Sequence, residues 1–378
     1  MSTAAQTTVH PPLRAAVVGA GYWGPNLARN FAASGDWELA AVCDTDMDRA
    51  TALARRTGAQ AAVASVDELL AEHDVDAVAV ATPARTHHPV AMAAIAAGKH
   101  VLVEKPLADT VERGREMVEA AAAAGTVLMA DHTYCYTPAV TRIRDLVAAG
   151  ELGDILYVDS TRINLGLVQP DVDVFWDLAP HDLSILDFVL PGGLQPLSVL
   201  AQGADPLRAG RSCVGYLTLP QESGALVHIN VNWLSPTKIR RMVIGGSRRT
   251  LVWDDLNPAQ RLSIFDRGVD LARQERERGD VLSRRDVTIS YRTGDTWSPA
   301  LPEYEALAMM VTELAVAVRG GTAPPTDGSS ALRVLDVLEA ASASLAEGGV
   351  HTGLRPGPAD EARTAPTAPE LDVAAVAP

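Results

Sequence analysis

Three glycines near the N-terminus constrain the fold of this chain more than any other feature. Gly19, Gly21 and Gly24 form a GxGxxG pattern. The pattern directly follows a short apolar run at Arg14–Val18 and opens a helical pattern at Pro25–Ser34. In such a unit the first glycine permits a tight turn, the second lets the backbone approach a pyrophosphate, and the third lets helix and strand pack closely. The pattern therefore predicts a dinucleotide-binding βαβ unit.

A carboxylate after the second expected strand refines this prediction. Asp44 follows the apolar run Glu38–Cys43 and lies 20 residues beyond Gly24. A carboxylate there accepts hydrogen bonds from the hydroxyls of the adenosine ribose and repels a 2′-phosphate. We therefore expect NAD as the cofactor, with NADP less favoured. For Tyr22 and Trp23 two interpretations stay open, because they either line the cofactor or substrate cleft or pack against the second domain.

Strand and helix patterns alternate from Leu13 to about residue 130. Further strands are expected at Asp76–Ala81, His100–Val103 and Val127–Ala130. Helices are expected at Asp46–Thr57, Asp67–Ala71, Pro89–Ala97 and Thr110–Ala124. Strands that alternate with helices of this length predict an α/β domain with a parallel, doubly wound sheet, which is the Rossmann arrangement.

The pattern changes after about Tyr136. Helices are expected at Pro138–Ala149, Asp177–Leu190, Glu303–Arg319 and Ser330–Ala346. Strands are expected at Ile155–Leu165, Leu197–Ala201, Cys213–Leu219, Ala225–Trp233, Arg240–Gly245 and Thr250–Trp253. The charged segment Asp270–Asp286 is expected to be a solvated loop or an exposed helix. These patterns predict a second, α+β domain with a large, mostly antiparallel open sheet.

The two patterns divide the chain at about residue 135. We expect a nucleotide-binding domain at 13–135 and an α+β domain at 136–354. The ends, 1–12 and 355–378, are expected to be disordered, because they are rich in Pro, Ala, Ser and Thr without a usable period.

Charge and cysteine content exclude several classes of function. The formal net charge of −15 argues against nucleic acid and anionic membrane surfaces as partners, although a local Arg or Lys pocket still permits an anionic substrate. The apolar runs are too short or too interrupted to span a bilayer, and the first twelve residues do not read as a signal peptide. Cys43, Cys135 and Cys213 are isolated, which suits a reducing compartment. We therefore expect a cytoplasmic protein.

Two short motifs contain the groups that alcohol oxidation needs. Asp177 and His181 lie four residues apart and share a face of one helical turn, while Lys105 lies at the expected end of a strand. Oxidation of an alcohol requires a base for the hydroxyl proton, a cation that stabilises the developing alkoxide, and a polar group that orients the substrate. Beside a nucleotide-binding fingerprint, these residues predict a nicotinamide-dependent dehydrogenase.

Metal binding is the alternative for the same pair. Asp and His at this spacing can ligate zinc, but no third ligand is evident, although Asp182 and Asp187 are near. His87-His88 is a poor pair of ligands because adjacent side chains point apart, and a loop or capping role is favoured. We therefore expect no metal.

Together these motifs resemble the glucose–fructose oxidoreductase, inositol dehydrogenase and rhizopine-catabolism family, Gfo/Idh/MocA. The resemblance covers roughly Leu13 to Gly349 and rests on GxGxxG, Ala81-Thr82-Pro83 with His87, Glu104-Lys105-Pro106, and Asp177 with His181. It implies a Rossmann domain and a second domain that binds substrate and whose open sheet commonly forms homodimers or homotetramers.

The resemblance also implies roles for single residues. Lys105 would contact both the nicotinamide ribose and the substrate hydroxyl. His181 would be the general acid/base, and Asp177 would bind or orient the substrate. The Lys105–Pro106 peptide would be a candidate cis bond. The residues implied to line the cofactor are Thr82, Pro83, His87 and Glu104.

A narrower resemblance concerns Asp159–Gly166 and Val174–Asp182. These segments are similar to those of family members that act on nucleotide-linked sugars, notably dehydrogenases that oxidise C3 of UDP-N-acetylglucosaminuronate. Ser160, Arg162 and Asn164 alternate along one expected strand and should face one side. Arg162 is suited to a uronate carboxylate or a diphosphate. The alternative is a polar row that faces solvent.

Tyr136, just past the domain junction, is a further candidate for substrate contact. Other functions on the same scaffold are an inositol or free-sugar dehydrogenase, a ketosugar reductase, and a dinucleotide-binding regulator without turnover. The presence of both Lys105 and His181 argues against the regulator, because a sensor needs no acid/base pair.

Overall fold

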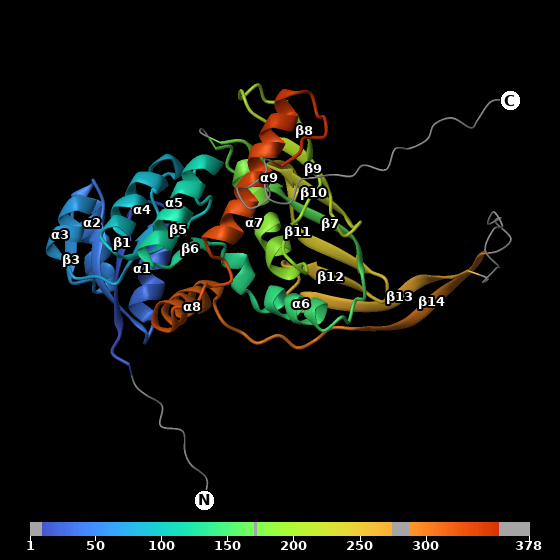
Figure 1. Cartoon of the computed structure of the whole chain (residues 1–378), viewed down its shortest axis with the longest axis horizontal. Coiled ribbons are helices and arrows are strands. Elements are labelled where there is room, and N and C mark those ends of the chain that lie inside the picture. Colours follow the sequence, from blue (N-terminus) through green and yellow to red (C-terminus); the bar gives the residue numbers. More distant parts are fainter. Residues whose placement is uncertain (1–9, 170–171, 274–286, 355–378) are drawn as a thin grey trace, which may run out of the picture.

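The first half of the chain forms a six-stranded parallel sheet in the order β3-β2-β1-β4-β5-β6 (Figure 1). The structure is a computed structural model that describes residues 10–169, 172–273 and 287–354. The strands are β1 (Leu13–Val18), β2 (Trp37–Cys43), β3 (Ala61–Val63), β4 (Ala77–Val80), β5 (His100–Glu104) and β6 (Leu128–Asp131). This order confirms the predicted doubly wound sheet. The three-residue strand β3 was not predicted.

Helices cover both faces of this sheet. One face is packed by α1 and α2, through residues such as Leu27, Phe31 and Leu53, and the opposite face by α3, α4 and α5. The bounds are α1 (Gly24–Ala33), α2 (Met47–Thr57), α3 (Val66–Glu72), α4 (His87–Ala96) and α5 (Val111–Ala124). Short 3-10 helices, η1 (Ala84–Thr86) and η2 (Thr133–Tyr136), follow β4 and β6.

The second half forms an eight-stranded sheet in the order β14-β13-β12-β11-β7-β10-β9-β8. All neighbouring strands are antiparallel except the parallel pair β7 and β10, which confirms the mostly antiparallel open sheet. Its strands are β7 (Ile155–Leu165), β8 (Leu200–Ala204), β9 (Val214–Pro220), β10 (Leu226–Asn232), β11 (Leu234–Gly246), β12 (Thr250–Asp254), β13 (Leu262–Arg273) and β14 (Val287–Trp297).

The strands β13 and β14 form a hairpin that projects from the body of the molecule (Figure 1). The prediction of a loop or exposed helix from Asp270 was therefore wrong for residues 270–273, and residues 274–286 lie outside the described residues. Val269 pairs with Tyr291 across the hairpin. Aromatic and β-branched residues with a period of two favour strands, and this pattern outweighed the density of charge.

One face of the second sheet is packed by α6 (Pro138–Ala148), α7 (Val174–Val189) and α9 (Gly328–Ala346). Helix α9 contacts both α5 and β8, so it lies between the two halves. None of the described helices is long and apolar enough to cross a membrane. The predicted disordered ends lie outside the described residues, apart from residues 10–12.

Helix α8 (Ala306–Gly320) returns from the C-terminal part of the chain to the first sheet. Its residues Leu307, Met310 and Val311 share a core with Phe31 and Trp37. The indole Nε1 of Trp37 donates a hydrogen bond to the carbonyl oxygen of Val311 at 2.7 Å. This helix therefore completes the core of the nucleotide-binding half, although it lies in the sequence range expected for the second domain.

Candidate active site

The two halves bring together the three residues that were predicted to be catalytic. Lys105 directly follows β5, at the carboxyl edge of the first sheet, and α7 presents Asp177 and His181. The Nζ of Lys105 donates to the backbone carbonyl of Asp177 at 2.9 Å and to its carboxylate Oδ1 at 3.3 Å. Side chains more than seventy residues apart in sequence thus form one cluster between the halves.

The N-terminal turn of α7 fixes this cluster. The helix begins at Val174, three residues before the predicted start, because the Asp173 carboxylate accepts from the backbone N–H groups of Phe175 and Trp176 at 3.0 and 3.1 Å. Pro180 lies inside the helix and contributes no N–H to its hydrogen-bond ladder. The capped start holds Asp177 opposite Lys105.

The second carboxylate oxygen of Asp177 is also engaged. Its Oδ2 accepts a hydrogen bond from the indole Nε1 of Trp233 at 2.9 Å, and Trp233 is fully buried. The predicted substrate residue Asn164 lies beside Gly166 and Trp233, because a Cβ at Gly166 would meet both side chains. Asp177 is therefore oriented from two sides, by a cation and by an indole.

His181 occupies a partly buried, positively charged environment. Its ring packs edge-on against Tyr134 at 5.1 Å between centroids, and its Nδ1 is enclosed without a hydrogen-bond partner among the described residues. Burial lowers the pKa of His181 well below its ordinary value, and the nearby charges of Lys105, Arg162 and Arg240 lower it further. The imidazole is therefore neutral at pH 7 and able to accept a proton.

Arg162 contacts the same Tyr134 ring as His181, but its charged partner is a carboxylate of the protein itself. Its Nε and Nη2 donate to the carboxylate of Asp182 at 2.7 and 3.2 Å, and both side chains are 3% exposed. Ser160 donates to the same carboxylate at 2.9 Å. The alternation of Ser160 and Arg162 toward one side is confirmed. The expectation that Arg162 is free for a ligand carboxylate is not met, because Asp182 already accepts its bidentate pair.

Sequence reasoning missed two residues next to this pair. The guanidinium of Arg162 lies 4.4 Å from the centre of the Tyr134 ring, and that of Arg240 lies 5.6 Å from it. Arg240 on β11 is directly opposite Arg162 on β7. Only the strand register reveals this neighbour, since the two residues are far apart in sequence.

The glycine loop has the shape that a dinucleotide requires. Gly19 has φ +102°, and a Cβ there would lie 2.6 Å from the carbonyl oxygen of Ala81. A Cβ at Gly24 would collide with the carbonyl of Gly19, whereas one at Gly21 would meet nothing within 4 Å. Close packing at two glycines and open space at the middle one fit a pyrophosphate at the N-terminus of α1. Asp44 closes the loop by accepting from the N–H of Ala20 at 2.7 Å.

His87 bridges two loops at the edge of the cofactor site. Its two ring nitrogens lie 2.8 Å from the carbonyl oxygens of Thr82 and Pro106, and its side chain is buried. It therefore holds these loops together, while Thr82 and Pro83 lie between β4 and η1. The Lys105–Pro106 peptide is cis, as predicted.

Trp23 and Glu104 both interact with the buried carboxylate of Asp131. The indole Nε1 of Trp23 donates to Asp131 at 2.6 Å. Burial and the nearby charge of Asp131 raise the pKa of Glu104 well above its usual value. Tyr22 is 94% exposed, so it does not pack against the second half of the chain.

Tyr136 was predicted to contact the substrate, but the structure places it in the core. Its side chain is 4% exposed and belongs to the core that α8 completes, and its hydroxyl hydrogen-bonds the hydroxyl of Thr326 at 2.9 Å. Asp187, considered above as a metal ligand, is paired with Arg333 at 2.6 Å. The described part of the chain contains no group of three or more His, Cys, Asp or Glu residues that could hold a metal ion.

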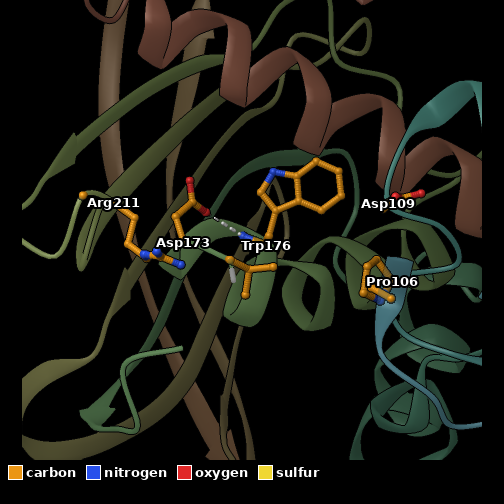
Figure 2. Close-up of a pocket in the computed structure, with 8 residues that line it drawn as sticks. Pro106, Asp109, Asp173, Trp176 and Arg211 are labelled. Atoms are coloured by element: carbon orange, nitrogen blue, oxygen red, sulfur yellow. Dashed lines mark hydrogen bonds between the residues drawn. The ribbon is translucent and has the colours of Figure 1, made fainter. Parts of the chain in front are cut away.

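A cleft of about 470 Å³ is bordered by Pro106 and Trp176, the chain neighbours of Lys105 and Asp177. Figure 2 shows its walls, with Arg211 and Asp109 on either side of Trp176 in this view. Ala84, Pro106 and Asp109 come from the first half, and Asp173, Trp176 and Arg211 from the second. The cleft therefore lies between the halves.

Models of two families match this chain. Residues 13–132 match the model described as "Oxidoreductase family, NAD-binding Rossmann fold", and residues 140–252 match the "GFO/IDH/MocA C-terminal domain". A UDP-N-acetylglucosamine 3-dehydrogenase of Acidithiobacillus ferrooxidans is 33% identical over 260 residues, which cover 68% of this chain and 78% of that protein. A 1,5-anhydro-D-fructose reductase of Ensifer adhaerens is 39% identical over 163 residues, so the chain spans about half of its length, 49%, and 40% of this chain is covered.

Solved structures show the same likeness over most of the chain. The crystal structure of the A. ferrooxidans enzyme has a TM-score of 0.73 at 27% identity and covers 88% of this chain and 97% of that one. GenD2 from gentamicin A biosynthesis, in complex with NAD, has a TM-score of 0.74 at 27% identity and covers 92% and 98%. The chain therefore belongs to the Gfo/Idh/MocA oxidoreductase family.

Proposed function

We propose that this Gfo/Idh/MocA protein is an NAD-dependent dehydrogenase that exchanges hydride between a secondary hydroxyl of a sugar and nicotinamide. The observation that carries the proposal is the meeting of Lys105, Asp177 and His181 at the carboxyl edge of the first sheet. In open α/β sheets this edge is where nucleotides bind. This position supports roles for His181, Lys105 and Asp177 as base, cation and orienting carboxylate beside the nicotinamide of a bound cofactor.

Each residue has a role that follows from its surroundings. NAD, when bound, supplies the acceptor for the hydride. His181, neutral because of burial and neighbouring cations, accepts the proton of the substrate hydroxyl. Lys105 stabilises the oxygen as negative charge develops on it. Asp177 and Trp233 hold the position of that ammonium group and of the substrate beside it.

Asp44 supports NAD rather than NADP. Its carboxylate lies at the end of β2, and Asp46 and Asp48 follow it on the exposed start of α2. Three carboxylates near the adenosine ribose disfavour a 2′-phosphate electrostatically. A ratio of kcat/KM for NAD over NADP well above one is expected, and a ratio below one would remove this argument.

We propose C3 of a nucleotide-linked sugar as the reacting carbon, with UDP-N-acetylglucosaminuronate or a related UDP-sugar as substrate. The name of the A. ferrooxidans relative, a UDP-N-acetylglucosamine 3-dehydrogenase, supports this substrate class. The name of the Ensifer relative, a 1,5-anhydro-D-fructose reductase, favours a second candidate, reduction of a ketosugar. The same residues serve both directions.

We also propose a homodimer or homotetramer. The outer face of the second sheet exposes Tyr157, Leu165, Tyr216 and Leu226, and a second copy that covered this face would remove them from water. The sedimentation behaviour of the purified chain measures this.

Turnover of the variant His181→Asn tests the proposed chemistry. Formation of NADH is measured with a panel of UDP-sugars, free sugars and inositols. Asparagine cannot act as the base, so kcat should fall by about 10²–10⁴-fold, while NAD affinity, measured by protein fluorescence, stays near that of the unchanged enzyme. Unchanged turnover in the variant would remove His181 from the mechanism. NAD binding without turnover of any substrate would favour the regulator.

A further inference from the structure

We infer that the cleft beside the catalytic cluster binds the nucleoside diphosphate of the substrate through Arg211, Trp176 and Asp109. The inference rests on the proposed function, because it places the part of a nucleotide-linked sugar that does not react. A volume of about 470 Å³ is within the range of small-ligand pockets. Trp176 and Pro106, which border the cleft, are direct chain neighbours of two residues of the catalytic cluster. A ligand with its sugar at that cluster therefore has this cleft within reach.

Arg211 supplies a cation for phosphate oxygens. It lies between β8 and β9 and forms no salt bridge with the described residues; its one hydrogen bond there runs from Nε to the carbonyl of Ala209, at 3.4 Å. The loop before it is held closed, because the carboxylate of Asp205 accepts from the N–H groups of Ala209 and Gly210 at 2.9 and 2.8 Å. The terminal N–H groups of Arg211 are thus free within the described structure, in the forked geometry that favours phosphate.

Trp176 supplies a flat apolar surface that is already fixed. Its indole Nε1 donates to the hydroxyl of Ser342 on α9 at 2.9 Å, and its backbone N–H donates to Asp173 at 3.1 Å. The ring is partly exposed to the cleft. Because the ring is already held, a base or ribose that packs on it costs little side-chain entropy.

Asp109 supplies an acceptor without a donor. Its Oδ2 accepts from Arg113 at 2.6 Å, whereas its Oδ1 is enclosed and has no hydrogen-bond partner among the described residues. An unsatisfied buried oxygen of this kind is costly and is normally paired with a donor. The side chain is 29% exposed and borders the cleft, so a turn of the carboxylate would bring Oδ1 to a ribose hydroxyl or a base N–H, and either is such a donor. The three side chains together match a ligand with an anion, a ring and a donor group, which a nucleoside diphosphate combines.

The test uses the full chain saturated with NAD and titrated with UDP in a calorimeter. The variant Arg211→Ala loses a charge-assisted contact, so the Kd for UDP and the KM for UDP-N-acetylglucosamine should rise about 10- to 100-fold. The matched control is Arg261→Ala, which removes an exposed arginine directly before β13, outside the residues that line the cleft. The control should bind UDP as the unchanged enzyme does.

Three results would overturn the subsite. They are no binding of UDP by the unchanged enzyme, equal UDP affinity in Arg211→Ala, or a rise in the KM for NAD in place of that for the UDP-sugar, which would assign the cleft to the cofactor. Failure of the proposed function is recognised separately. In that case the unchanged enzyme oxidises free sugars or inositols but no UDP-sugar, whatever Arg211→Ala does to UDP binding.

Discussion

Helix α7 contributes to two ion pairs that differ in almost every physical respect. Asp177 faces Lys105 across the two halves of the molecule at 3.3 Å, with the side chains 21% and 17% exposed. Asp182, five residues later, faces Arg162 within the second half at 2.7 Å, with both side chains 3% exposed. The first pair is partly exposed, which leaves Lys105 able to meet a substrate. The second is closed and holds α7 on β7.

The two ion pairs of α7 therefore have different proposed roles. The Arg162–Asp182 pair holds the helix in position, and the Lys105–Asp177 pair takes part in the chemistry. If a buried ion pair loses one residue, the charge of the other is left without a partner away from water. In a partly exposed ion pair, either charged group can instead bind a ligand or water. The closed pair anchors the turn that carries His181 between Asp177 and Asp182. We therefore expect changes at Arg162 to act mainly on stability and changes at Lys105 mainly on turnover.

The largest expected effect is on stability, in Arg162→Met. The variant leaves the Asp182 carboxylate buried with only Ser160 as a donor, so the free energy of unfolding should fall by about 3–5 kcal/mol. Urea unfolding measures it. The double variant Arg162→Met/Asp182→Leu removes both charges and should recover most of the loss. A loss below about 1 kcal/mol in the single variant would show that the closed pair does not anchor α7.

The next effect is on turnover, in Lys105→Met. Removing the cation that stabilises the developing oxyanion should lower kcat by about 10²–10³-fold. The free energy of unfolding should fall less than in Arg162→Met, because this pair is partly exposed and Asp177 keeps the hydrogen bond from Trp233. Lys238→Met is the matched control, since Lys238 is exposed on β11. A large loss of stability with retained turnover would reverse the roles of the two pairs.

The smallest effect is a shift of pH dependence, in Arg240→Gln. The charge of Arg240 helps to lower the pKa of His181, so its removal should raise that pKa and move the acid limb of kcat to higher pH. The pH profile of oxidation between about pH 5 and 8 measures the shift. The low pKa of His181 also makes the stability of the folded state depend on pH. A histidine with a raised pKa would stabilise the fold at low pH, whereas His181 does the reverse. As pH falls below about 6.5 the unfolded chain takes up a proton that folded His181 does not, so the folded state loses stability. An acid limb that stays in place would exclude Arg240 from tuning the base.

The first half of the chain was predictable because its signals are local. The three glycines, the carboxylate of Asp44 and the alternation of strand and helix each depend on residues within one βαβ unit. Strand β3 was missed because Ala61–Val63 is too short to show a period. In the second half, the regular alternation of Val287–Tyr291 was obscured by the charged segment before it.

The partners of the site residues were less predictable than the residues themselves. The choice of Asp182 for Arg162, and of Thr326 for Tyr136, depends on how β7, α7 and α9 pack and not on any motif. The motifs in the sequence predicted Lys105 and His181 as catalytic residues. They did not identify three residues that contact the site: Tyr134, Arg240 and Trp233. Arg240 reaches the site through strand register, Tyr134 through a ring contact with His181, and Trp233 through a hydrogen bond to Asp177.

The return of α8 to the first sheet affects how the chain folds as it leaves the ribosome. Leu307, Met310 and Val311 complete the core around Phe31 and Trp37, so one face of the nucleotide-binding half stays uncovered until residue 320 has been synthesised. The nucleotide-binding half therefore cannot complete its core from N-terminal residues alone, as domain-by-domain folding during synthesis would require. A chain released before α8 would carry exposed apolar surface into solvent and would tend to aggregate. The core of the nucleotide-binding half is therefore complete only after α8 has been synthesised.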